Sequence, residues 1–256
     1  MRTSPPFLTS LWAATAIVTA TAIPVVAQET DDYAKLGPNA VAITSDAAYL
    51  RAAFAPDYWA YAPFTKPQFT TSACSIASVT AAINGIMGQP EWASETIMSQ
   101  TDLLELTGNA QWAALSAEGG DGVTFQQLVD FTTAALGAVE LGRDVTVFHP
   151  AAATDVSRAQ MIEMLVENEA SADDAIMVYF NQGVVTGDWD GPHISLIGAY
   201  DAAQDRVLIL EVDQEWYIPY WTSVDTLMEA IVKPTSDEHG PLDGETGGFV
   251  MVRAAG

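Results

Sequence analysis

The spacing of apolar residues changes along this chain, and that change constrains its fold most strongly. In the first half, Ile76, Val79, Ile83 and Ile86 recur at intervals of three and four residues, as on one buried face of a helix. In the second half, apolar residues gather in short β-branched and aromatic runs that are typical of strands. Helices followed by strands predict an α+β fold, in which an N-terminal helical part packs on a C-terminal antiparallel β-sheet.

Capping and turn residues predict where these elements begin and end. We expect helices to begin near Ser45, Ser75, Ser94, Thr124, Ser157 and Ser223, with Thr124 and Gln127 forming a capping box and Ser72 capping the Ser75 helix. We expect strands at Ala175–Phe180, His193–Ala199, Arg206–Val212 and Phe249–Arg253. No internal repeat or linker divides the rest of the chain, so it is expected to be one domain.

The first 27 residues have the composition of a secretory signal peptide. Arg2 supplies one positive charge, no charged residue occurs from Phe7 to Ala27, and small residues precede Gln28. An uncleaved membrane anchor is the alternative, because about 20 apolar residues can span a bilayer. We expect residues 1–27 to be cleaved, and residues 28–256 to be an exported domain, periplasmic or secreted, without stable membrane insertion.

The chain is strongly acidic. Its 9 Lys and Arg residues face 33 Asp and Glu residues, which gives a formal net charge of −24. Such a surface repels nucleic acid and anionic membranes, so neither is an expected partner.

Cys74 is the only cysteine, so the chain has no internal disulfide. A free thiol in an exported protein is unusual, because oxidising compartments favour disulfides. One interpretation is a small buried apolar residue. The other is a nucleophile, because a cysteine in the first turn of a helix lies at the positive end of the helix dipole, which favours the thiolate.

A base and an acid for this thiol follow from hairpin geometry. His193 opens an expected strand, and if the following turn is centred on Ala202, paired residue numbers sum to 404 and Glu211 lies opposite His193. A shift of two residues would put Asp213 there, and a shift of one would turn the carboxylates to the other face. The alternative is a polar pair on a solvent-exposed sheet face.

Several segments resemble the phytochelatin synthase family, which are papain-like glutathione γ-glutamylcysteinyltransferases. The matching segments are Gln68–Ser78, Asp121–Phe125, Gly191–Asp201, Asp205–Val212 and Gly248–Val252, in consistent order over roughly residues 40–253. The resemblance implies a papain-like catalytic domain at residues 28–256.

By this resemblance, Cys74 is the nucleophile, His193 the base, Glu211 the triad acid, and Gln68 a donor to the oxyanion. It also assigns Tyr217, Gln214 and Ser195 to substrate binding. The chain departs from the family at Ala73-Cys74-Ser75, where the family has Tyr-Cys-Gly, at Glu211, where it has Asp, and at Gln214, where it has an Arg that holds the substrate.

The implied reaction is attack of Cys74 on the Cys–Gly bond of glutathione, with glycine released and γ-glutamylcysteine passed to water or to a second glutathione. No built-in cofactor or metal site is expected, and cadmium or zinc would enter as a metal–glutathione thiolate substrate. A homodimer remains open. The alternatives are a papain-like peptidase acting on another small peptide or amide, and a non-catalytic scaffold that binds a ligand or a metal.

Overall fold

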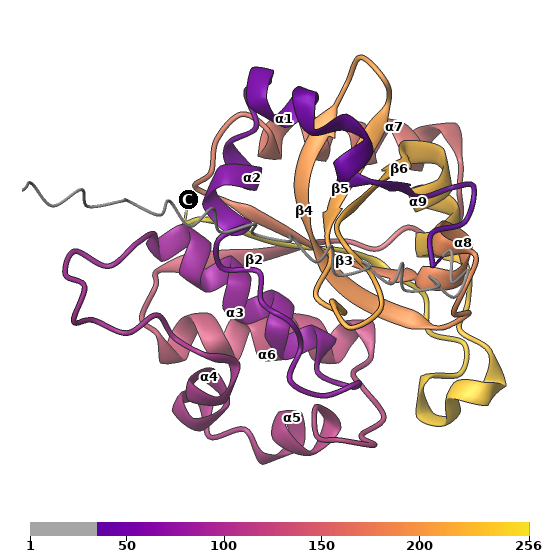
Figure 1. Ribbon diagram of the computed structural model, residues 1–256. Coiled ribbons are helices and arrows are strands. Elements are labelled where there is room, and N and C mark those ends of the chain that lie inside the picture. The colour runs from indigo at the N-terminus through magenta and orange to yellow at the C-terminus, as the bar shows by residue number, and fades with distance from the viewer. Residues whose placement is uncertain (1–34, 256) are drawn as a thin grey trace, which may run out of the picture. The chain divides into compact units, whose positions relative to one another are not determined.

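A seven-stranded sheet organises residues 35–255, the part of the chain that the computed structural model describes (Figure 1). Its strand order is β1-β6-β5-β4-β3-β7-β2, and every neighbouring pair is antiparallel. The expected signal peptide at residues 1–27 lies outside the described residues and remains a prediction. Among residues 35–255, no helix has both the length and the apolar character needed to cross a membrane.

The elements of this part of the chain have the following bounds. The strands are β1 (Val41–Ala42), β2 (Arg143–Phe148), β3 (Ala175–Asn181), β4 (Pro192–Asp201), β5 (Arg206–Leu210), β6 (Tyr220–Ser223) and β7 (Gly248–Ala254). The α-helices are α1 (Ala47–Ala52), α2 (Pro56–Tyr61), α3 (Cys74–Met87), α4 (Gln100–Thr107), α5 (Ala110–Leu115), α6 (Phe125–Ala138), α7 (Asp155–Asn168), α8 (Gln182–Thr186) and α9 (Val224–Val232). Two 3₁₀ helices, η1 (Ile43–Asp46) and η2 (Asp237–Leu242), complete the set.

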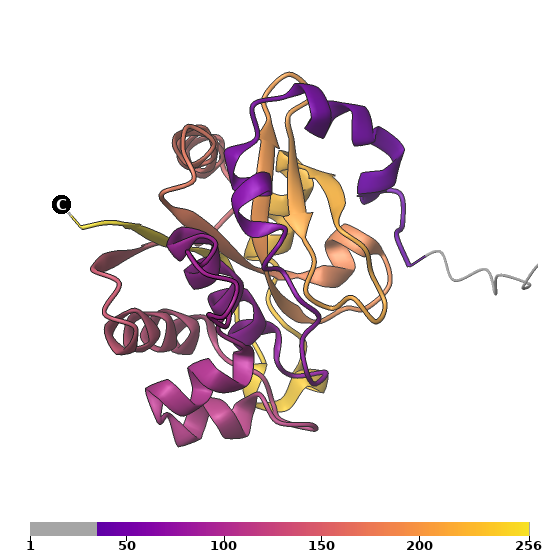
Figure 2. The same ribbon diagram turned by 60° about the vertical axis from the view of Figure 1, so that its left-hand side comes forward.

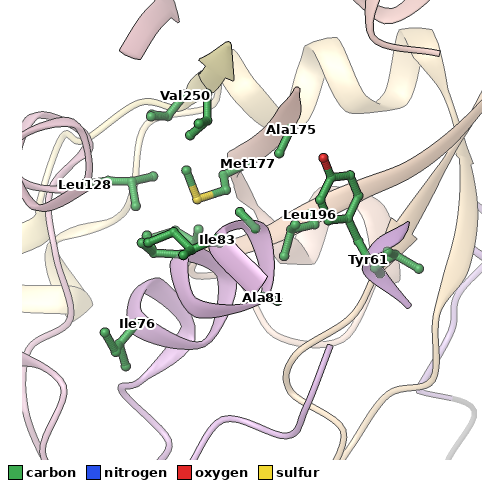
Figure 3. Close-up of a cluster of buried hydrophobic side chains, with 14 of the residues drawn as sticks. Tyr61, Ile76, Ala81, Ile83, Leu128, Ala175, Met177, Leu196 and Val250 are labelled. Atoms are coloured by element: carbon green, nitrogen blue, oxygen red, sulfur yellow. The ribbon is translucent and has the colours of Figure 1, made fainter. Parts of the chain in front are cut away.

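Helices cover both faces of the sheet, and each face has its own core. On one face, α3 and α6 pack on the strands, and Figure 3 shows Ile83 of α3 close to Met177 of the sheet. Helix α4 packs against α3 and α6 on this side (Figure 2). On the other face, α7, α8 and α9 enclose a second apolar cluster. The α+β class expected from the sequence is confirmed.

The expected helix starts were correct where the capping side chain makes its bond. Thr124 and Gln127 form the predicted capping box of α6, and Ser223 caps α9. Helix α7 begins at Asp155, close to the expected start at Ser157, and Thr154 caps it. Two expectations were wrong. Helix α4 begins at Gln100 with Ser99 as its cap rather than near Ser94. Ser72 does not cap α3, because its hydroxyl donates to the Gly120 carbonyl oxygen instead.

A β-bulge at Gly198 sets the register between β4 and β5. The turn covers residues 202–205, so Asp201 pairs with Arg206 next to it, and beyond the bulge Leu196 pairs with Leu210. The paired numbers therefore sum to 407 near the turn and 406 beyond the bulge, and the predicted sum of 404 was wrong. Because side chains alternate along each strand, residues of two paired strands share a face when their numbers add to the same parity as the paired residues. The extra residue at the bulge makes the paired sum even, so His193 and Glu211 lie on the same face.

We predict that Gly198→Ala destabilises the fold, because a Cβ at this position would lie 2.5 Å from Leu210 Cγ. The expected loss in free energy of unfolding is about 1–3 kcal/mol, the usual cost of overpacking. Urea denaturation measures it. The matched control is Gly137→Ala in α6, where an added Cβ has no neighbouring atom within 4 Å and the helix should gain about 0.5–1 kcal/mol. Equal midpoints for the two variants would contradict this account of the bulge.

Candidate active site

The sulfur of Cys74 lies in the first turn of α3, at a position that hydrogen bonds define closely. Ahead of the helix, the Thr70 hydroxyl donates to the Ser116 carbonyl oxygen at 2.6 Å, and the Ser72 hydroxyl donates to that of Gly120 at 2.6 Å. The backbone N–H of Cys74 is among the first-turn donors that have no acceptor within the helix. The first turn therefore places a thiol and unsatisfied N–H groups together.

Two buried hydroxyl groups attach α3 to its surroundings. The Ser78 hydroxyl, one turn beyond Cys74, donates to the Ile194 carbonyl oxygen on β4 at 3.1 Å. Trp112 Nε1 donates to Ser75 Oγ at 2.9 Å, and both side chains are buried. Because Ile194 follows His193 directly, the Ser78 bond sets the nucleophile helix against the strand that bears the imidazole.

The imidazole of His193 contacts a buried carboxylate. His193 Nε2 lies 2.6 Å from Glu211 Oε1, and the two residues are 3% and 0% exposed. The Asp213 backbone N–H also donates to Oε1 at 2.7 Å, and Gln182 Nε2 donates to Oε2 at 3.3 Å. The carboxylate thus has three donors in an apolar setting, which is what a buried charge requires.

This contact is diagonal across the sheet rather than between directly opposed residues. Strand β5 ends at Leu210, and the register beyond the bulge, continued past that residue, would set Asp213 opposite His193. Glu211 is then one pair further along on the same face, and its longer side chain spans the diagonal. The predicted His193–Glu211 contact exists, although the register used to derive it was wrong.

Burial and charge act in opposite directions on this pair. Burial lowers the pKa of His193, but the charge of Glu211 and the hydrogen bonds to Cys74 and Glu211 raise it well above the ordinary value. Burial raises the pKa of Glu211, and the charge of His193 together with the hydrogen bonds holds it below the ordinary value. The pair therefore favours an imidazolium facing a carboxylate, and Nδ1 is left as the ring nitrogen available to Cys74.

A cavity of about 510 Å³ brings most of the predicted residues together. Cys74, His193, Gln68 and Tyr217 all line it, and Glu211 lies behind His193. The Gln68 N–H donates to the Val212 carbonyl oxygen at 2.8 Å, which ties the segment before α3 to the chain after β5. The buried Gln68 Oε1 has no hydrogen-bond partner among the described residues. The Tyr217 hydroxyl donates to Asp188 Oδ2 at 2.8 Å.

Gln214 and Ser195, assigned to substrate binding by resemblance, lie outside the lining of this cavity. Gln214 Nε2 donates to the Glu211 carbonyl oxygen at 2.9 Å, and its side chain borders two neighbouring depressions. Ser195 is fully buried, and its hydroxyl donates to the Leu210 carbonyl oxygen at 2.7 Å. Both side chains brace the segment that carries Glu211.

Sequence reasoning missed two residues that the structure places at the site. Gln182 lines the cavity and donates to Glu211, and Asp213 lines the same cavity. A signal for Gln182 was present, because it lies just after the expected strand Ala175–Phe180, which the structure pairs with the His193 strand. Asp213 was indicated only by the alternative hairpin register, which would set it opposite His193.

Residues 35–255 contain no cluster of three or more His, Cys, Asp or Glu side chains arranged to hold a metal ion. His239 lies in the acidic loop that includes η2, and its Nε2 lies 2.7 Å from the Asp190 carbonyl oxygen.

A family model described as phytochelatin synthase matches residues 33–240, well over half of the 256-residue chain. The matched range contains Cys74, His193 and Glu211. A search of curated proteins returned no match.

We predict that Glu211→Gln lowers the pKa of His193, because the carboxylate charge is a main cause of its elevation. NMR titration of the imidazole resonances measures the shift, and the chain has only three histidines to assign. The wild-type imidazole should stay protonated to higher pH than that of the variant. The control is Glu215→Gln, an exposed neighbour whose charge is not a cause of the His193 shift. Identical His193 titrations in wild type and Glu211→Gln would contradict the electrostatic account.

Proposed function

The chain belongs to the phytochelatin synthase family, and on this premise we propose that it cleaves the Cys–Gly bond of glutathione through a thioester on Cys74. Membership makes it a papain-like enzyme of the acyltransferase class, concerned with glutathione-related γ-glutamylcysteine transfer. The observation that best supports the finer proposal is the single thiol, at a helix N-terminus, in one cavity with a carboxylate-bound imidazole.

In the proposed first step, the Cys74 thiolate bonds to the carbonyl carbon of the cysteinyl residue of glutathione. The C–N bond to glycine then breaks, and the His193 imidazolium gives its proton to the leaving amine. Glu211 holds the imidazole in orientation and stabilises its charged form. The products of this half-reaction are glycine and a γ-glutamylcysteinyl thioester on Cys74.

In the second step, the neutral imidazole accepts a proton from the incoming nucleophile as that nucleophile attacks the thioester. Water gives γ-glutamylcysteine, and the amino group of a second glutathione gives a phytochelatin. Either attack breaks the C–S bond and regenerates the Cys74 thiolate beside the His193 imidazolium. Cadmium or zinc takes part as a thiolate complex of the substrate, outside any resident metal site.

Negative charge develops on the carbonyl oxygen in both steps, and Gln68 is the proposed donor to it. Its carboxamide lines the cavity beside Cys74, and the first-turn N–H of Cys74 supplies a second donor. Removing one donor of this kind costs roughly 10²–10³ in kcat.

We predict that purified protein releases glycine from glutathione and that Cys74→Ser abolishes this release. Glycine quantified by amine derivatisation gives the rate, and intact-protein mass spectrometry of quenched wild type should show a γ-glutamylcysteinyl adduct. Glu215→Gln is the matched control, because its exposed side chain lies outside the cavity lining and should leave the adduct in place.

Three outcomes separate this proposal from the alternatives. Undiminished glycine release by Cys74→Ser would overturn covalent catalysis. A different peptide cleaved far faster than glutathione, with the same dependence on Cys74, would identify a peptidase. If no thiol peptide is cleaved and none forms an adduct with Cys74, the result would favour the non-catalytic binding scaffold.

A further inference from the structure

Asp213 is a carboxylate in the cavity wall for which the proposed chemistry has no use. Its side chain is partly buried and lines the 510 Å³ cavity together with Cys74 and His193. Its backbone is engaged, because the N–H donates to Glu211 and the carbonyl oxygen accepts from the N–H groups of Trp216 and Tyr217. Within residues 35–255, its carboxylate oxygens have neither a hydrogen bond nor an ion pair.

The other acidic side chain of the cavity wall is already occupied. Asp188 Oδ2 accepts hydrogen bonds from Lys35 Nζ at 2.9 Å and from the Tyr217 hydroxyl at 2.8 Å. Lys35 Nζ also lies 4.7 Å from the centre of the Trp216 ring. An acid and an aromatic ring on this wall thus already hold one ammonium group, and Asp213 is the second acidic residue that lines the cavity.

Electrostatics favour a cationic ligand group at Asp213. Burial, the largest cause, raises the pKa of its carboxyl above the ordinary value. The charge of His193 lowers this pKa, those of Glu211 and Glu215 raise it, and that of Lys35 lowers it. A partly buried carboxylate gains from a charge-assisted hydrogen bond, which is stronger than a neutral one. A ligand carboxylate would instead meet repulsion, and the Gln214 side chain beside it carries no positive charge and points elsewhere.

We propose that Asp213 is a specificity-determining residue that binds the protonated amino group of the substrate. This inference rests on the proposed function, since glutathione carries one amino group, the α-ammonium of its γ-glutamyl residue. Asp213 follows Glu211 by two residues, and its N–H donates to the same carboxylate oxygen that contacts His193. The anchor for the ammonium group is therefore built into the segment that orients the base.

The test compares glutathione with N-acetylglutathione, which lacks the ammonium charge, and with N-methylglutathione, which keeps it. Wild type should prefer glutathione to the acetylated peptide by about tenfold or more in kcat/KM, the effect of one hydrogen bond to a charged group. The N-methyl peptide should react like glutathione. Asp213→Asn should bring the preference close to unity, mainly through KM for glutathione. Because the measured quantity is the ratio of kcat/KM for two peptides, a change in the triad that slows both reactions equally leaves the ratio unchanged.

Glu215→Gln is the matched control, since it removes the same charge from an exposed position outside the cavity lining. It should keep the wild-type preference. The inference is overturned if wild type shows no preference, if Asp213→Asn keeps it, or if Glu215→Gln loses it equally. Calorimetric binding of the same three peptides to Cys74→Ser, with and without Asp213→Asn, gives the ratio without turnover. Absent glycine release would then refute the proposed reaction, whereas an unchanged binding ratio would refute the ammonium anchor.

Discussion

The buried contact between His193 and Glu211 is the interaction on which the site depends. A carboxylate that is 0% exposed is costly unless it is paired, and here the imidazole, a backbone N–H and an amide group satisfy it. That pairing holds the imidazole by Nε2 and leaves Nδ1 for the thiol. The Ser78 bond to the Ile194 carbonyl oxygen then brings the start of α3 to the same strand. Loss of either link would separate the groups that the proposed chemistry combines.

In the β4–β5 hairpin, the sequence predicted correctly that His193 and Glu211 share a face, but it predicted the wrong register. Alternation of side chains along strands placed His193 and Glu211 on one face, and that conclusion holds. The register itself could not be derived, because the turn covers residues 202–205 instead of being centred on Ala202, and a bulge at Gly198 adds one residue. At the bulge, Gly198 lies against the Leu210 side chain, a tertiary contact that no local pattern in the sequence indicates.

Side chains whose partners lie far away in the chain were the least predictable. The capping box at Thr124 follows from residues three apart, whereas Ser72 had the choice between its own helix and the Gly120 carbonyl oxygen, and the distant partner prevailed. Gln214 could be recognised as a departure from the family, but only the structure shows its amide bonded to the Glu211 carbonyl oxygen. Asp213 lines the cavity and Gln214 does not, so the proposed determinant of substrate preference is Asp213.

The most direct test of the account is the rate at which iodoacetamide alkylates Cys74, measured at pH 6 in wild type and in His193→Gln. Because the thiolate is the reactive species, a thiol that shares its proton with a neighbouring imidazole reacts in mildly acidic solution. The account predicts rapid wild-type alkylation at pH 6 and at least about a tenfold loss in His193→Gln, with the two rates converging at alkaline pH. Equal rates at pH 6 would show that the thiol and the imidazole do not act together.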